Sequence, residues 1–182
     1  MEGCRKNSWS CYCGGHQGAK YDELFAPEHQ LEAILPPIKE ERDKWGDFPI
    51  IAAGGIWDRN DIEKIMDLGA DAVQMGTRFI GTYECDASPV LKQVLLDSKE
   101  EDIVIVSSPV GYPGRAVKTN LIKTLEPDTK KIKCISNCIF PCNKGEGARR
   151  VGYCIADSLG DAYLGRLQSG LFFSGANGYK LK

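Results

Sequence analysis

Glycine-containing dipeptides follow two short apolar runs in the middle of the chain, and both could bind a phosphate group. Gly54-Gly55 ends the run Phe48–Ala53, and Gly76-Thr77 ends the next run. Backbone N–H groups at the ends of neighbouring strands point into one crevice, and glycine lets an anion approach them closely. The Thr77 hydroxyl adds one more hydrogen-bonding group. Without structural context, the pattern supports a phosphate site and plain tight turns about equally.

A histidine near the N-terminus is the candidate general base. His16 lies in the sequence Gly-Gly-His-Gln-Gly that starts at Gly14. Imidazole titrates near neutral pH, and glycine neighbours leave its ring accessible. The alternative is a surface-loop histidine without a role. His29 has charged neighbours in a helical stretch, and we interpret it as a solvated bystander.

Four cysteines close together offer a second kind of chemistry. They are Cys134, Cys138, Cys142 and Cys154, and such thiolates could bind zinc or an iron–sulfur cluster. Their spacing differs from the C-x2-C pairs of common zinc modules, and Pro141 prevents one helix from presenting the first three. Reduced thiols suit a cytoplasmic protein better, so we assign no metal ligand.

The elements that must position the glycines form one βαβ unit over residues 48–77. Phe48–Ala53 is apolar on both faces, which favours a buried parallel strand. Asp58 is a plausible N-cap for a helix that ends at Gly69, and Ala70–Met75 is the second strand. The two strands are expected to be parallel through a right-handed crossover, with the helix dipole adding to the phosphate site.

Other elements follow from periodicity and turn signals. A helical pattern over Tyr21–Trp45 should be interrupted at Pro36-Pro37, and Pro89–Leu96 is predicted to be a helix. Ile103–Val106 is β-prone and is followed by a turn-rich loop to Arg115. Helices are predicted over 116–125 and near 148–168, before a glycine-rich tail.

Bulk composition excludes several classes of protein. Of the 182 residues, 42% are hydrophobic and 26% charged, and the net charge is −2, so we expect no nucleic-acid partner. No apolar run is long enough to span a membrane and the N-terminus has no signal-peptide core. The sequence predicts a cytoplasmic protein without a membrane partner.

Four ordered motifs resemble the nitronate monooxygenase (2-nitropropane dioxygenase) family. Pro49-Ile-Ile-Ala-Ala-Gly-Gly-Ile56 and Gln74-Met-Gly-Thr-Arg-Phe79 look like its double FMN signature, which flavin-dependent enoyl-ACP reductases share. The segment around His16 resembles the Gly-Gly-His-x-Gly loop, and Pro113–Asn120 resembles the Pro-x-Arg-x-x-x-Asn stretch. The similarity runs from about residue 14 to the end.

The resemblance implies an α/β fold and a set of site residues. Residues 1–85 would be the C-terminal part of an FMN-binding (β/α)8 TIM barrel, about strands six or seven to eight, and 86–182 a mostly helical extension with the cysteine cluster. His16 would be the catalytic base. The residues that would match FMN contacts are Gly14, Gly15, Gly54, Gly55, Gln74, Met75, Gly76 and Thr77.

The function implied by the resemblance is FMN-dependent oxidation of alkyl nitronates, with a nitronate or nitroalkane and O2 as small-molecule partners. A flavin-dependent enoyl-ACP reductase using NAD(P)H is an alternative, and a non-catalytic fragment or cysteine-based metal module is another. A full barrel needs at least about 200 residues, so we expect a truncated or partial enzyme. The sequence leaves two further partners open, which are a missing N-terminal half and a second copy of this chain in a homo-oligomer.

Overall fold

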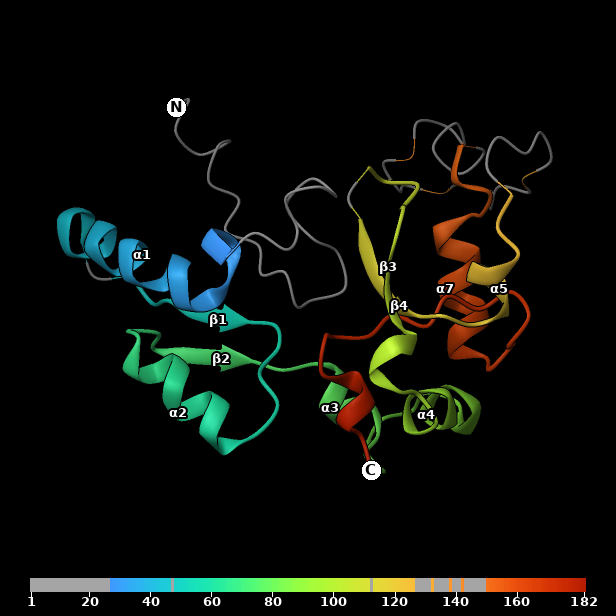
Figure 1. The fold of residues 1–182 in the computed structure, drawn as a ribbon, viewed down its shortest axis with the longest axis horizontal. Helices are drawn as coiled ribbons and strands as arrows, with labels where there is room; N and C mark the ends of the chain where they lie inside the picture. The colour runs from blue at the N-terminus through green and yellow to red at the C-terminus, as the bar shows by residue number, and fades with distance from the viewer. Residues whose placement is uncertain are drawn as a thin grey trace.

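The computed structural model describes residues 27–46, 48–111, 113–126, 132, 138, 142 and 150–182. These residues form two groups of elements that lie side by side (Figure 1). The first group contains η2 (Pro27–His29), α1 (Leu31–Trp45), β1 (Ile51–Ala53), α2 (Arg59–Asp67) and β2 (Ala72–Gln74). The second contains α3 (Thr77–Ile80), α4 (Pro89–Leu96), η3 (Glu100–Asp102), β3 (Ile103–Val106), β4 (Gly114–Val117), α5 (Asn120–Lys123), α7 (Ile155–Tyr163) and η4 (Gly178–Lys180).

The first group confirms the predicted βαβ unit. Strands β1 and β2 are parallel, with Ile51 opposite Ala72 at one end of the register. Helix α2 connects them and begins with a capping box, in which Asp58 accepts a hydrogen bond from the Asp61 N–H and Asp61 accepts from the Asp58 N–H. The two strands therefore end at the same edge of the sheet.

Only one face of this two-stranded sheet is covered by described residues. Ala52 is buried against Leu35 of α1 and Ile65 of α2, so both helices pack on that face. On the other face Ile51 is 60% exposed, and Gln74 is exposed as well. The expectation of strands buried on both faces is therefore wrong for this chain, because both helices lie on the same side.

The expected interruption of the first helix at Pro36-Pro37 is wrong, as α1 shows. It runs unbroken through Pro36 and Pro37, although each proline removes one backbone hydrogen bond. Both prolines lie on the exposed side of the helix, while Leu35 is buried and Ile38 packs against the same core cluster. Packing of this apolar face therefore outweighs the local cost of the prolines.

The second group contains a β-hairpin that the sequence did not predict. Strand β3 pairs antiparallel with β4, so that Ile103 faces Val117 and Val106 faces Gly114. β4 occupies the end of the predicted turn-rich loop and the start of the predicted helix over 116–125, of which only α5 is helical. Pairing with the β-branched β3 outweighs the local pattern. Among the described residues after 85, the expected helices are thus joined by a β-hairpin that the prediction of a mostly helical extension did not include.

Two apolar clusters hold this group together. Leu95 of α4, the predicted helix, packs with Trp57, Phe172 and Leu181, which come from distant parts of the chain. The hairpin packs on α7 and the preceding residues through a cluster that includes Ala116, Tyr153 and Ile155. Within the described part of the chain, no helix is long and apolar enough to cross a membrane.

Candidate functional site

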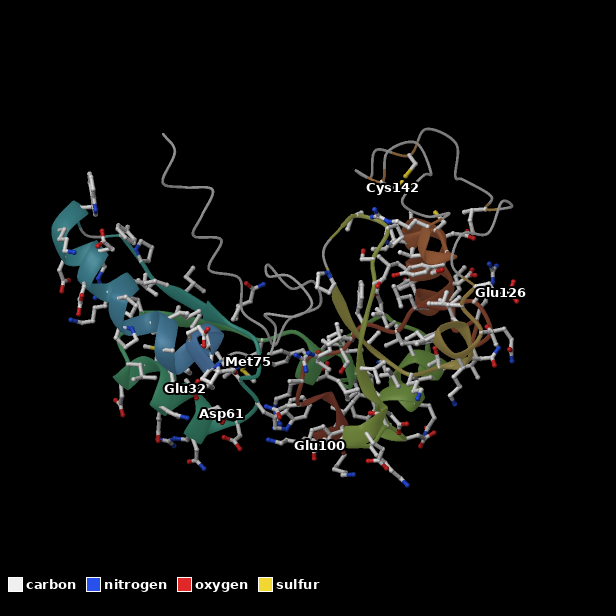
Figure 2. The ribbon with its side chains drawn as sticks, turned by 45° about the horizontal axis from the view of Figure 1, so that its top comes forward. Glu32, Asp61, Met75, Glu100, Glu126 and Cys142 are labelled. Carbon is white, nitrogen blue, oxygen red and sulfur yellow. The ribbon has the colours of Figure 1, made fainter. Side chains whose placement is uncertain are left out.

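A pocket of about 360 Å³ lies where the first group of elements meets the second. Met75, which directly follows β2, lies at this junction (Figure 2). The pocket combines the two predicted glycine loops with the C-terminal tail. Its lining residues are Ala53, Gly54, Gly55, Ile56, Trp57, Gln74, Met75, Gly76, Thr77, Arg78, Ile80, Phe173, Ser174, Gly175, Asn177 and Gly178.

The structure thus brings together six of the residues expected at an FMN site: Gly54, Gly55, Gln74, Met75, Gly76 and Thr77. They meet because β1 and β2 are parallel and each is followed directly by its glycine loop. Gly14, Gly15 and His16 lie outside the described residues. Their predicted roles, and the predicted FMN contacts of the six pocket residues, remain predictions.

The backbone of the first loop requires glycine. Gly54 has φ 100° and Gly55 has φ 70°, and both values lie in the left-handed region that other residues rarely adopt. In the second loop, a side chain built on Gly76 would meet no atom within 4 Å, so this backbone is open to a ligand. Both loops therefore expose main-chain groups to the pocket.

The Thr77 side chain contributes a polar group whose hydrogen bonding is partly defined. Its Oγ1 accepts a hydrogen bond from the Gly175 N–H at 2.8 Å. A hydroxyl has one proton to donate and can accept as well. Thr77 lines the pocket, and accepting from the tail does not use the proton of its hydroxyl.

Arg78 is the only ionisable residue among the described residues that line the pocket. Its guanidinium lies over the ring of Trp57, 5.3 Å from the ring centroid, while the Trp57 side chain is 7% exposed. A cation above an aromatic face is attracted by the ring. Trp57 therefore helps hold a positive charge at the pocket, and no carboxylate among these lining residues opposes it.

Helix α2 does not add its N-terminus to this pocket, contrary to expectation. None of its residues lines the pocket. The Asp61 N–H is bonded to Asp58, and the Asp61 carboxylate in turn accepts from the Trp57 N–H at 2.8 Å. These carboxylates already satisfy the start of the helix and place negative charge there. The positive character of the pocket must come from the loops and Arg78.

The C-terminal tail is a part of the pocket that sequence reasoning missed. Phe173, Ser174, Gly175, Asn177 and Gly178 form one wall. The only sequence signal for them was the glycine-rich composition of the tail. Nothing local indicated that a segment about a hundred residues downstream folds onto the glycine loops.

The cysteine cluster shows no metal site in the part of the chain that the structure describes. Cys138, Cys142 and Cys154 are free thiols, and Cys142 is buried. Cys134 lies outside the described residues. No group of three or more potential ligands is placed to hold a metal among the residues described. The choice between thiols and a metal site stays a prediction.

A larger cavity of about 700 Å³ lies between β3 and α5, away from the glycine loops. Its walls are mainly apolar, from Val106, Ile122 and Leu125, and Arg150 lies at one side. Residues 127–149, most of which lie outside the described part, connect Leu125 to Arg150. We therefore assign no ligand to this cavity, although it is larger than the pocket at the glycine loops.

Comparison with protein families and curated proteins gives one consistent result. A family model described as nitronate monooxygenase matches residues 11–182. A probable nitronate monooxygenase from Staphylococcus saprophyticus is 35% identical over 109 residues, covering 60% of this chain and 30% of that protein. One from Staphylococcus aureus strain Newman is 32% identical over 117 residues, covering 62% and 31%. The chain thus spans less than a third of the length of these relatives.

Comparison with solved structures gives the fold. FabK from Thermotoga maritima superposes with a TM-score of 0.66 at 26% identity, over 94% of this chain and 47% of that chain. A nitroalkane oxidase from Streptomyces ansochromogenes superposes with a TM-score of 0.62 at 21% identity, over 94% and 45%. The predicted α/β fold class is confirmed, and the arrangement of the described elements matches part of a larger enzyme fold.

Proposed function

This chain belongs to the nitronate monooxygenase family, and we propose that it supplies the phosphate-binding part of an FMN site in an enzyme that oxidises alkyl nitronates. The observation that carries this proposal is the pocket at the ends of β1 and β2. There the two glycine loops, the Thr77 hydroxyl and Arg78 converge, without an opposing carboxylate among the described lining residues.

The residues of the pocket fit a phosphate monoester. Its volume of about 360 Å³ is at the small end of ligand pockets, as expected for a phosphate and the adjoining part of a ligand. A phosphate at neutral pH carries up to two negative charges and needs several donors. The Thr77 hydroxyl, the Arg78 guanidinium and the main chain of the glycine loops are donors of that kind.

Each group has a defined task in this proposal. Gly54, Gly55 and Gly76 let the main chain approach the phosphate, Thr77 donates a hydrogen bond, and Arg78 balances charge. Bound flavin would supply the electron acceptor for nitronate oxidation, with O2 as co-substrate. His16 would accept the α-proton of a nitroalkane at a ring nitrogen, as the family resemblance implies.

The flavin-dependent enoyl-ACP reductase alternative shares the FMN signature, so the pocket does not discriminate against it. FabK and the nitroalkane oxidase superpose on this chain with similar TM-scores of 0.66 and 0.62. The reactions differ in their second substrate. A nitronate oxidase consumes O2 without a nicotinamide, whereas an enoyl reductase consumes NAD(P)H.

The test is a pair of assays on protein loaded with FMN. Oxygen uptake is recorded with propane-2-nitronate, and NADPH oxidation is recorded with crotonyl thioester. Because the chain spans 30% of the Staphylococcus saprophyticus relative, both assays are run on the chain alone and on the chain fused behind the N-terminal part of that relative. The His16→Asn variant of the fusion serves as the control for the base.

The proposal predicts that the fusion takes up oxygen with the nitronate. With a neutral nitroalkane as substrate, oxygen uptake should be lower in the His16→Asn variant than in the unmodified fusion. NADPH oxidation without oxygen uptake would support the enoyl reductase instead. Neither activity, together with no bound flavin, would leave the non-catalytic fragment as the better description.

A further inference from the structure

The C-terminal tail binds both glycine loops through hydrogen bonds that span most of the chain. Its Asn177 Nδ2 donates to the Gly55 carbonyl at 2.5 Å, across 122 residues of sequence. Its Gly175 N–H donates to Thr77 Oγ1 at 2.8 Å, across 98 residues. The tail lies beside α3, where Figure 1 shows the C-terminal segment next to the start of the second group. Among the described residues, the tail is thus the one segment that donates hydrogen bonds to both loops.

The tail is anchored on both sides of these contacts. Before them, Phe172 is buried and its carbonyl accepts from the Val117 N–H at 2.9 Å, and Phe173 forms a bridge with Ala116 of β4. After them, Leu181 is buried in the same cluster as Phe172. The pocket-lining part of the tail is therefore held between two core residues and is not a free end.

The fit between the tail and the second loop is close. Gly178 is buried, and a side chain built on it would overlap the Ser174 hydroxyl and come within 3.2 Å of Thr77 Cγ2. Interior packing of this kind allows little independent movement. The position of the Thr77 side chain is consequently set by the tail as well as by its own loop.

The hydrogen bond from Asn177 restrains one peptide unit of the first loop. A peptide unit is planar and trans, so fixing a carbonyl also fixes the direction of the N–H that follows it. By binding the Gly55 carbonyl, Asn177 orients the peptide between Gly55 and Ile56. Glycine lacks a Cβ and has more conformational freedom than other residues, so a loop with Gly54 and Gly55 at φ 100° and 70° gains order from an external restraint.

We propose that Asn177 is a positioning residue of the phosphate site. It holds the first glycine loop in the geometry that binds a phosphate monoester, while Gly175 of the same tail holds Thr77 of the second loop. This inference rests on the proposed function, since it assumes that the pocket binds the FMN phosphate. It adds a residue outside the two glycine motifs to the site. Because the proposal assigns only the phosphate end of the flavin to this pocket, the effect of Asn177 is expected on phosphate binding alone.

The test compares FMN with riboflavin, which lacks the phosphate, on the full chain. Dissociation constants are measured by flavin fluorescence for the unmodified protein and for Asn177→Ala and Asn177→Asp. Gln93→Ala is the matched control, because Gln93 Nε2 also donates to one acceptor, Asp97 Oδ1, but away from the pocket. Melting temperatures of the ligand-free variants are recorded in parallel.

Loss of one hydrogen bond should weaken FMN binding by Asn177→Ala about tenfold while riboflavin binding stays within about twofold. Asn177→Asp should weaken FMN further, because a carboxylate of almost the same shape repels both the carbonyl and the phosphate. Gln93→Ala should change neither affinity.

Unchanged FMN binding in both Asn177 variants, or an equal loss for FMN and riboflavin, would overturn the positioning role while the proposed function stands. If the unmodified chain does not prefer FMN to riboflavin, the proposed function itself fails, and the inference with it. Should Asn177→Ala unfold, the near-isosteric Asn177→Asp still provides the comparison of the two flavins.

Discussion

At the scale of single residues, Thr77 is the point where the second loop, the tail and the ligand space meet. Its hydroxyl accepts from the Gly175 N–H, and in the proposed function it donates its proton to the phosphate. We predict that Thr77→Val, which preserves shape and removes both interactions, lowers FMN affinity about tenfold and leaves riboflavin affinity nearly unchanged. Thr82→Val is the control, because the Thr82 hydroxyl donates to the Phe79 carbonyl outside the pocket. Equal FMN affinities for both variants would argue against a ligand contact at Thr77.

Arg78 carries the positive charge of the site, so the effect of removing it on FMN affinity should depend on salt concentration. Arg78→Gln removes the charge above Trp57, and we expect FMN affinity to fall about tenfold at low ionic strength, with a smaller difference in high salt because ions screen exposed charges. Titrations at two salt concentrations measure it. Arg59→Gln, which changes an exposed arginine paired with Glu63 on α2, is the control. A loss that does not depend on salt would point to packing on Trp57 instead of charge.

The residues predicted from the sequence and those missed differ in a physical way. Gly54, Gly55 and Gly76 were found because a strand followed by glycine is a local signal, and parallel strands must end at one edge. Asn177 was missed because its partner is 122 residues away. A polar residue in a glycine-rich tail has no local property that reveals such a contact.

At the scale of elements, Asp71 links the two strands of the βαβ unit with helix α1. Its carboxylate accepts from the Ile50 N–H at 2.7 Å, just before β1, and from Arg42 of α1 at 2.7 Å, while Asp71 itself precedes β2. The hydrogen bond from the Ile50 N–H, followed by that from Arg42, holds the pKa of Asp71 below its ordinary value. The charged form is therefore favoured in the folded protein.

This link predicts a pH-dependent stability. Because the folded pKa is lower than the unfolded pKa, the contribution of Asp71 is present above the unfolded value and is lost as the pH falls through the folded value. Asp71→Asn should therefore melt at a lower temperature than the unmodified chain at pH 7, and the difference should shrink below about pH 4. Thermal unfolding followed by circular dichroism at several pH values measures this. A difference that is constant with pH would contradict the assignment.

The start of α2 depends on its capping box, which gives a prediction for stability alone. Asp58→Ala removes the acceptor for the Asp61 N–H, and it should lower the free energy of unfolding by about 1 kcal/mol. Asp67→Ala, at the last residue of the same helix, should be neutral or slightly stabilising, because a carboxylate is unfavourable at that end. Urea denaturation compares the two variants. Equal losses would show that Asp58 does not act as a cap.

Element prediction succeeded where local signals and packing agreed. Helix α2 has a cap, an apolar period and a terminal glycine, and α4 begins with Pro89 behind the capping Ser88. It failed where tertiary contacts decided. The continuity of α1 depends on packing of Leu35, and β4 exists because Gly114–Val117 pairs with β3.

At the scale of the whole molecule, the main feature is that one face of the β1–β2 sheet is not covered by the described residues. Ile51, 60% exposed, lies on the face opposite α1 and α2. The chain spans 30% to 31% of the curated relatives it matches. Residues 1–85 are predicted to form the last strands of a barrel. In such a barrel this face would point toward the interior, where residues from other strands would cover it.

The central claim is that the loops after β1 and β2, closed by the tail, form the phosphate end of an FMN site. The most direct test is to incubate the purified chain with FMN or with riboflavin, pass each mixture through gel filtration, and record the flavin absorption spectrum of the protein fraction. The account predicts that FMN stays with the protein at close to one per chain and that riboflavin is released. Protein that emerges free of FMN, or that retains the two flavins equally, would contradict it.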